Sequence, residues 1–214
     1  MKKIHLLLVL CALLLTGCSS QELDGLGIVT SMELGKEKDL WTARAELVQF
    51  SDPDAEPGQS TRILVSSDSD LSRCIEEFKE TEGLPLYLGH LRLIILHPEL
   101  MEEQDSASLR ELCAYCLSNP QIRFNTVLAA ADSQEPVLNG LESTPENIGI
   151  DLSRRFRTFG TNAELSDLIN WLHKAGPVPE LPILETRDVN EQPVTAIRSQ
   201  EQYLPVTGRK EIKP

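Results

Sequence analysis

Two cysteines three positions apart, Cys113 and Cys116, form the pattern in this sequence that most suggests catalytic chemistry. A Cys-x-x-Cys pair supports thiol–disulfide exchange when it stands at the N-terminus of a helix just after a strand, because the helix dipole lowers the thiol pKa there. Here both cysteines share a helical stripe with Leu109, Leu112 and Leu117, which predicts mid-helix positions on the buried face. We therefore favour core packing for this pair and keep an envelope thiol oxidoreductase as the less favoured alternative.

The histidines and carboxylates show no arrangement that predicts a metal or catalytic site. His90, His97 and His173 are scattered and lack the spacing of zinc ligands. For His90, which follows a glycine, we favour a hydrogen-bonded imidazole at a turn over a ligand-binding role. The acidic residues at 99–105 lack the calcium-loop pattern and are interpreted as a solvated face. Neither a nucleophile elbow nor a Gly-rich phosphate loop occurs. We thus expect no catalytic residue, metal or cofactor, and the ligand-binding residues stay unknown.

Covalent chemistry of another kind is predicted at Cys18. Lys2 and Lys3 precede an apolar run over 4–15, and Leu-Thr-Gly-Cys follows at 15–18. A basic start, a short apolar run and small residues describe a secretory signal, here over 1–17, and the run is too short to span a bilayer. The last four residues resemble a bacterial lipobox, in which the signal is removed before a cysteine that carries the lipids. We expect an outer-face membrane anchor at Cys18. The alternative is an ordinary cleaved signal with an incidental cysteine.

The acidic charge balance excludes some partners, and it means that the protein surface alone would not hold the chain on a membrane. The 214 residues carry 33 acidic and 20 basic side chains, a formal net charge of −13. Such a surface repels nucleic acid and anionic lipid headgroups, so membrane adhesion must come from acyl chains. The three cysteines beyond Cys18, Cys74, Cys113 and Cys116, do not form a disulfide framework, and we expect the core to hold the fold.

The periodicity predicts an α/β (α+β) domain on a mixed sheet. A strand pair at 26–34 and 41–50, joined by a longer polar loop at 35–39, reads as an antiparallel hairpin. Further strands are expected at 61–66, 91–96, 122–130 and 181–185, and helices at 71–78, 109–117, 148–156 and 165–172. The order places several packed helices around the hairpin and later parallel crossovers, with the apolar run 91–96 at the centre of the sheet.

Two helix starts and the C-terminal segment are also predicted. Thr144-Pro145 reads as a cap with proline at the first helical position, and Thr161-x-x-Glu164 as a capping box. Residues 187–214 are polar with weak alternation, and we expect a tail there. The predicted organisation is a signal peptide at 1–17, a domain at 18–186 and a tail at 187–214.

Several segments together resemble the N-terminal region of the Ger(x)C family, the lipoprotein C subunits of spore nutrient germinant receptors. They are LDGLGIVTSM at 23–32, LYLGHLRLIIL at 86–96, NPQIR at 119–123 and LPI at 181–183. Family members have an ELND-AIV-G start, a YFGHLRVIVIGE block and a DPEIR helix end in the same order. The resemblance runs from about Cys18 to Glu185.

The resemblance implies a non-enzymatic subunit on the outer surface of the inner spore membrane. It would assemble there with two multi-spanning receptor subunits, A and B, with Cys18 as the diacylglycerol-modified residue and no catalytic residues. The large C-terminal domain that usually follows in the family is not expected within 187–214. A membrane-tethered solute-binding lipoprotein is the other alternative to this function.

Overall fold

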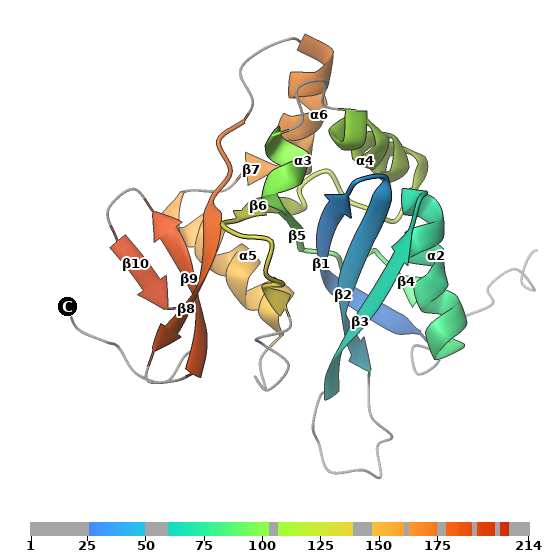
Figure 1. Cartoon of the computed structure of the whole chain (residues 1–214), viewed down its shortest axis with the longest axis horizontal. Helices are drawn as coiled ribbons and strands as arrows, with labels where there is room; N and C mark the ends of the chain where they lie inside the picture. Colours follow the sequence, from blue (N-terminus) through green and yellow to red (C-terminus); the bar gives the residue numbers. More distant parts are fainter. Residues whose placement is uncertain are drawn as a thin grey trace, which may run out of the picture.

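One mixed sheet organises the part of the chain that the computed structural model describes, which is residues 26–49, 60–102, 107–138, 147–160, 163–174, 179–189, 192–199 and 202–205 (Figure 1). The strand order across the sheet is β10-β9-β8-β6-β5-β1-β2-β3, with the short β4 and β7 paired to β1 and β6. The strands are β1 (Gly27–Glu37), β2 (Leu40–Gln49), β3 (Ser60–Asp68), β4 (Leu86–Tyr87), β5 (Leu93–Leu96), β6 (Val127–Ala131), β7 (Ala163–Glu164), β8 (Ile183–Val189), β9 (Gln192–Ser199) and β10 (Gln202–Pro205). The helices are α2 (Leu71–Glu82), α3 (Pro98–Glu102), α4 (Ala107–Ser118), α5 (Ile148–Phe159) and α6 (Leu165–Lys174).

The predicted hairpin and parallel crossovers are confirmed. β1 pairs antiparallel with β2, and β2 pairs antiparallel with β3, whereas β1–β5, β5–β6 and β6–β8 are parallel pairs. The hairpin loop is shorter than predicted, because Glu37 still pairs with Leu40 and Lys38 closes the turn with a left-handed φ of 58°. All four residues of β5 are buried, which agrees with its predicted place at the centre of the sheet.

Helices cover both faces of the sheet around β5. Ile94 and Leu96 belong to one core cluster, together with buried residues of α2, α4 and α6. Leu93 and Ile95 belong to a second cluster, together with Leu152 and Phe156 of α5. Because successive strand residues point to opposite faces, the two clusters lie on opposite sides of the sheet. Figure 1 shows α2 and α5 on either side of the β1–β3 strands.

One predicted strand start and one predicted capping box are wrong, and a second predicted cap falls outside the described residues. The strand predicted at 122–130 begins only at Val127, because residues 119–126 form turns whose amides bond back to carbonyls three residues earlier. Helix α5 begins at Ile148 with Asn147 as its N-cap, and the predicted Thr144-Pro145 cap lies outside the described residues. Residues 163–164 pair with β6, so α6 begins at Leu165 and no capping box ends in Glu164.

The C-terminal segment contains more regular structure than its composition predicted. The final strand expected at 181–185 is instead Ile183–Val189, and it continues into an antiparallel hairpin with β9, which then pairs with β10. The predicted domain end at 186 thus falls within β8. The division into signal, domain and tail stays a prediction, and Cys18 lies outside the described residues.

Candidate functional site: a cationic cleft

The three described cysteines are buried and free, and the helical stripe predicted this burial for Cys113 and Cys116. Cys113 and Cys116 lie inside α4, on the face that packs against the core. Burial raises the pKa of Cys113 to about 11 and, together with the neighbouring thiol, that of Cys116 to about 12. Since the thiolate is the nucleophile in disulfide exchange, protonated and inaccessible thiols do not provide a redox site.

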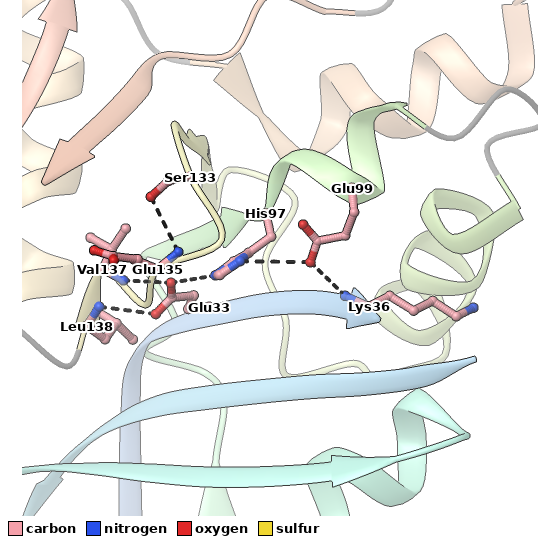
Figure 2. A network of polar contacts seen from close by, with 8 residues as sticks. All are labelled: Glu33, Lys36, His97, Glu99, Ser133, Glu135, Val137 and Leu138. Atoms are coloured by element: carbon pink, nitrogen blue, oxygen red, sulfur yellow. Dashed lines mark hydrogen bonds and ion pairs between the residues drawn. The ribbon is translucent and has the colours of Figure 1, made fainter. Parts of the chain in front are cut away.

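His97 takes part in a buried polar network that the sequence analysis did not identify (Figure 2). Its Nε2 lies 2.7 Å from Oε1 of Glu33, a β1 residue with no exposed surface. The Glu33 carboxylate also accepts the backbone amides of Val137 at 2.8 Å and Leu138 at 3.1 Å. A buried carboxylate must be hydrogen-bonded to be tolerated, and these three partners satisfy it. The group fixes the segment after β6 against β1.

The network continues on the other side of His97, where the predicted solvated face is partly wrong. His97 Nδ1 lies 3.9 Å from Oε1 of Glu99, and that oxygen accepts the backbone amide of Lys36 at 3.1 Å (Figure 2). The Lys36 ammonium in turn donates to Ser108 at 3.1 Å and lies 3.6 Å from Glu111. Glu99 is therefore a structural bridge between β1 and α3. Among the described residues no group of three His, Cys, Asp or Glu side chains could hold a metal ion.

Glu46 of β2 is a second buried carboxylate, and it holds the N-terminus of α5. It accepts the backbone amides of Ile148 at 2.7 Å and Gly149 at 2.9 Å, and the hydroxyls of Thr30 at 2.7 Å and Ser31 at 2.9 Å. Thr30 and Ser31 both reach it because β1 has a bulge between Val29 and Ser31, which changes the side-chain alternation. A carboxylate is favourable at this position because the N-terminal end of a helix carries partial positive charge.

A close backbone contact fixes α5 on β1 as well. A Cβ atom on Gly149 would lie 2.4 Å from the Thr30 carbonyl oxygen, so only glycine fits there without movement. The same Thr30 oxygen accepts the Arg92 amide at 2.9 Å. Thr30 thus links the start of α5 to the segment that leads into β5.

An open cleft lies between α5 and this segment. Helix α5 contributes Ile150, Ser153, Arg154, Arg157 and Thr158, which recur every three or four residues and so share one helical face. The segment before β5 contributes His90 and Arg92. The cleft has a volume of about 500 Å³. We refer to it as the cationic cleft, because three arginines line it in a chain whose net charge is −13.

The arginines of the cationic cleft have no carboxylate partner within 4.0 Å among the described residues. Arg157 Nη2 donates to the Asn125 carbonyl at 2.9 Å, which holds its side chain in place. His90 is exposed, and its ring stands 5.6 Å from that of Tyr87. The hydrogen bond predicted for the His90 imidazole is not found within the described segments. Gly89 allows the close turn, because a Cβ there would meet the Tyr87 ring at 2.4 Å.

A comparison with protein-family models identifies the family of this chain. The model for the spore germination protein N-terminal domain matches residues 19–186. This chain belongs to that family. No curated protein and no solved structure matches it.

The match confirms the resemblance to the N-terminal region of Ger(x)C proteins and gives this chain a role in spore germination. The matched residues contain both buried carboxylates and every residue that lines the cationic cleft. In the described part of this spore germination domain, no helix combines the length and apolarity needed to cross a bilayer.

The cationic cleft was not predicted from the sequence, although part of its signal was present there. Arg154 and Arg157 stand three residues apart on the face of α5 opposite its buried residues, a spacing visible in the sequence. What could not be seen is that Arg92 and His90, from a distant segment, come to face them. Their approach depends on the Glu46 and Gly149 contacts that fix α5.

Proposed function

We propose that this chain is a lipid-anchored, non-enzymatic subunit of a spore germinant receptor that acts in nutrient-triggered germination. The observation that carries the proposal is the family match over residues 19–186. That match starts at Ser19, one residue beyond Cys18, and the signal peptide is expected to be removed just before Cys18. In this proposal Cys18 begins the mature chain and carries diacylglycerol.

The net charge of −13 supports attachment through lipid rather than through the protein surface. Anionic headgroups repel such a surface, so the protein itself contributes little to membrane affinity. One acyl chain binds a membrane only marginally, whereas two chains hold firmly. A diacylglycerol on Cys18 would therefore suffice to retain the domain at the outer face of the inner spore membrane.

A role through contact, without catalysis, is supported by how the described titratable groups are used. The thiols of Cys113 and Cys116 are buried and protonated, and Glu33 and Glu46 are saturated by backbone and side-chain donors. His97 is buried against Glu33. These groups stabilise the fold and leave no accessible acid, base or nucleophile in these positions.

The proposed partners are the multi-spanning A and B subunits of the receptor. The direct test is co-purification of the full-length tagged lipoprotein from spore membranes in mild detergent. We expect both multi-spanning proteins to accompany the wild type and the Ser19→Ala control, and to be lost with Cys18→Ala because the anchor no longer places the domain at the membrane. Purification of the wild type without any multi-spanning partner would contradict the proposal.

Neither alternative function has comparable support. A solute-binding lipoprotein commonly holds its ligand between two lobes. The described residues instead build one sheet with helices on both faces, and they show no second lobe. A thiol oxidoreductase needs an accessible thiol with a lowered pKa, whereas burial raises the pKa of both Cys113 and Cys116.

A further inference from the structure

We infer that the cationic cleft binds a small anion that carries a carboxylate or phosphate group. This goes beyond the proposed receptor role and does not depend on the lipid anchor. It rests on the arrangement of Arg92, Arg154 and Arg157, on the way that α5 is held, and on the size of the cleft.

The three arginines of the cleft gather without a compensating carboxylate within 4.0 Å in the part of the chain that the structure describes. By contrast, Arg155 of the same helix donates to Asp151 at 2.7 Å and forms an ion pair with it. Arg154 and Arg157 face the cleft instead, with Arg92 across from them and no carboxylate within 4.0 Å among the described residues. Like charges gathered in this way repel one another, and an anion between them removes that repulsion.

The two hydroxyls on the α5 side of the cleft already donate to backbone carbonyls, which leaves the arginines as donors for a ligand. The hydroxyl of Ser153 donates to the Ile150 carbonyl at 3.0 Å, and that of Thr158 to the Arg154 carbonyl at 2.9 Å. On the α5 side of the cleft, the side-chain donors that remain are therefore the guanidinium groups, whose planar fork matches carboxylate and phosphate oxygens. Ile150, which is 40% exposed, offers an apolar contact for the remainder of such a molecule.

Hydrogen bonds within the protein hold the start of α5 and the Arg157 side chain in place before a ligand arrives. Glu46 bonds the first two amides of α5, and Gly149 brings the helix against Thr30. The Asn125 carbonyl fixes Arg157. Groups that are already positioned lose less entropy on binding, so the contact that holds Arg157 favours anion binding at this position.

Size and net charge favour a small ligand over an acidic macromolecule. A volume of about 500 Å³ is within the range of small-molecule sites. Charges on a protein surface act over about 8 Å at physiological ionic strength. A small anion inside the cleft therefore responds to the arginines, whereas a large acidic partner would also face the remainder of a chain with net charge −13.

The test is isothermal titration calorimetry of the full-length lipoprotein in detergent at constant ionic strength. Inorganic phosphate and succinate are titrated separately, with chloride as the reference anion. Saturable binding of phosphate supports a phosphate ligand, and saturable binding of succinate supports a carboxylate ligand. Saturable heat from neither probe overturns the inference, and so does binding that is seen only with a poly-glutamate peptide or with anionic vesicles.

Variants then assign the binding to the cleft. Arg154→Gln and Arg157→Gln should each weaken the affinity about tenfold or more, because each removes a charge-assisted hydrogen bond. Arg110→Gln is the matched control, since it removes the same charge from an exposed position on α4, across the sheet. Equal weakening by Arg110→Gln would mean that only net charge matters and would overturn the inference.

A measurement on the wild-type protein tests the site without depending on the stability of any variant. Phenylglyoxal modifies accessible arginines, and peptide mass mapping reports the rate at each one. The anion that binds should protect Arg154 and Arg157 and leave Arg110 unprotected, and uniform rates at all three would refute the site. Because the isolated lipoprotein is used, failure of co-purification with receptor subunits leaves this result standing, and the reverse also holds.

Discussion

Replacement of Glu46 by glutamine tests how the fold positions the cationic cleft. The change keeps the size of the side chain and removes one acceptor oxygen and the charge. Oε1 accepts the Ile148 amide, and Oε2 accepts the Gly149 amide and two hydroxyls. In either orientation of the new amide group, its NH₂ takes the place of an oxygen that accepted at least one hydrogen bond. At least one N–H or O–H donor therefore loses its acceptor.

The expected loss of unfolding free energy follows from these contacts. An unsatisfied buried donor costs about 1–3 kcal/mol, and hydrogen bonds to a charged group contribute about 1.5–3 kcal/mol each. The lower desolvation cost of a neutral side chain offsets part of this. We expect Glu46→Gln to destabilise the domain by about 3 kcal/mol, a large part of the roughly 5–15 kcal/mol of a typical domain.

The assay is guanidinium denaturation followed by tryptophan fluorescence, since Trp41 is fully buried. Glu80→Gln is the matched control, because Glu80 is exposed on α2, and we expect its effect to stay within about 0.5 kcal/mol. Phosphate or succinate affinity should fall for Glu46→Gln even under conditions in which the variant is folded, because α5 is less firmly held. Equal stability of the two variants would refute the role assigned to this carboxylate.

Three further predictions concern other parts of the fold. Gly149→Ala should lower the melting temperature, although glycine to alanine normally stabilises a helix, because the added Cβ meets the Thr30 carbonyl; a higher melting temperature would contradict the close contact. Glu33→Gln should speed hydrogen exchange at the backbone amides of Val137 and Leu138, which donate to this carboxylate. Unchanged protection would contradict the role of Glu33 in fixing the segment after β6. Cys113 and Cys116 should resist iodoacetamide at pH 8 in the folded protein, and stability should fall as pH rises above about 9, because the unfolded thiols ionise there while the folded ones, with pKa values of about 11 and 12, stay protonated. The double variant Cys113→Ala/Cys116→Ala should reduce that alkaline slope, and an unchanged slope would assign it to other groups.

Local patterns were sufficient to predict the elements whose residues carry their own periodicity. The unbroken apolar run of β5 and the stripe that buries Cys113 and Cys116 each report a burial pattern that the structure confirms. The alternation in β1 and β2 predicted the two strands and their pairing, but β1 is buried on both faces over residues 27–35. The predictions failed for two reasons. Strand β6 starts late, at Val127, because of local turns that the alternation did not reveal. The extension of β8 and its hairpin with β9 depend on pairing within the sheet.

The buried carboxylates could not be predicted either, because their partners lie far away in the chain. Glu33 and Glu46 occupy polar positions in alternating strands, and the pattern alone indicates a solvent-facing side chain there. Their partners are the amides of Val137 and Ile148, which are 104 and 102 residues away in the chain. The Glu46 contacts hold the helix that lines the cationic cleft, so the cleft could be recognised only once the fold was known.

Germination kinetics test the central claim most directly. Spores that lack this gene are compared with spores complemented by the wild type, by Cys18→Ala or by Ser19→Ala, on a panel of single nutrients. A lipid-anchored receptor subunit predicts slower germination of the deletion on at least one nutrient, restored by the wild type and Ser19→Ala and not by Cys18→Ala. Unchanged germination of the deletion on every nutrient, or full rescue by Cys18→Ala, would contradict the account.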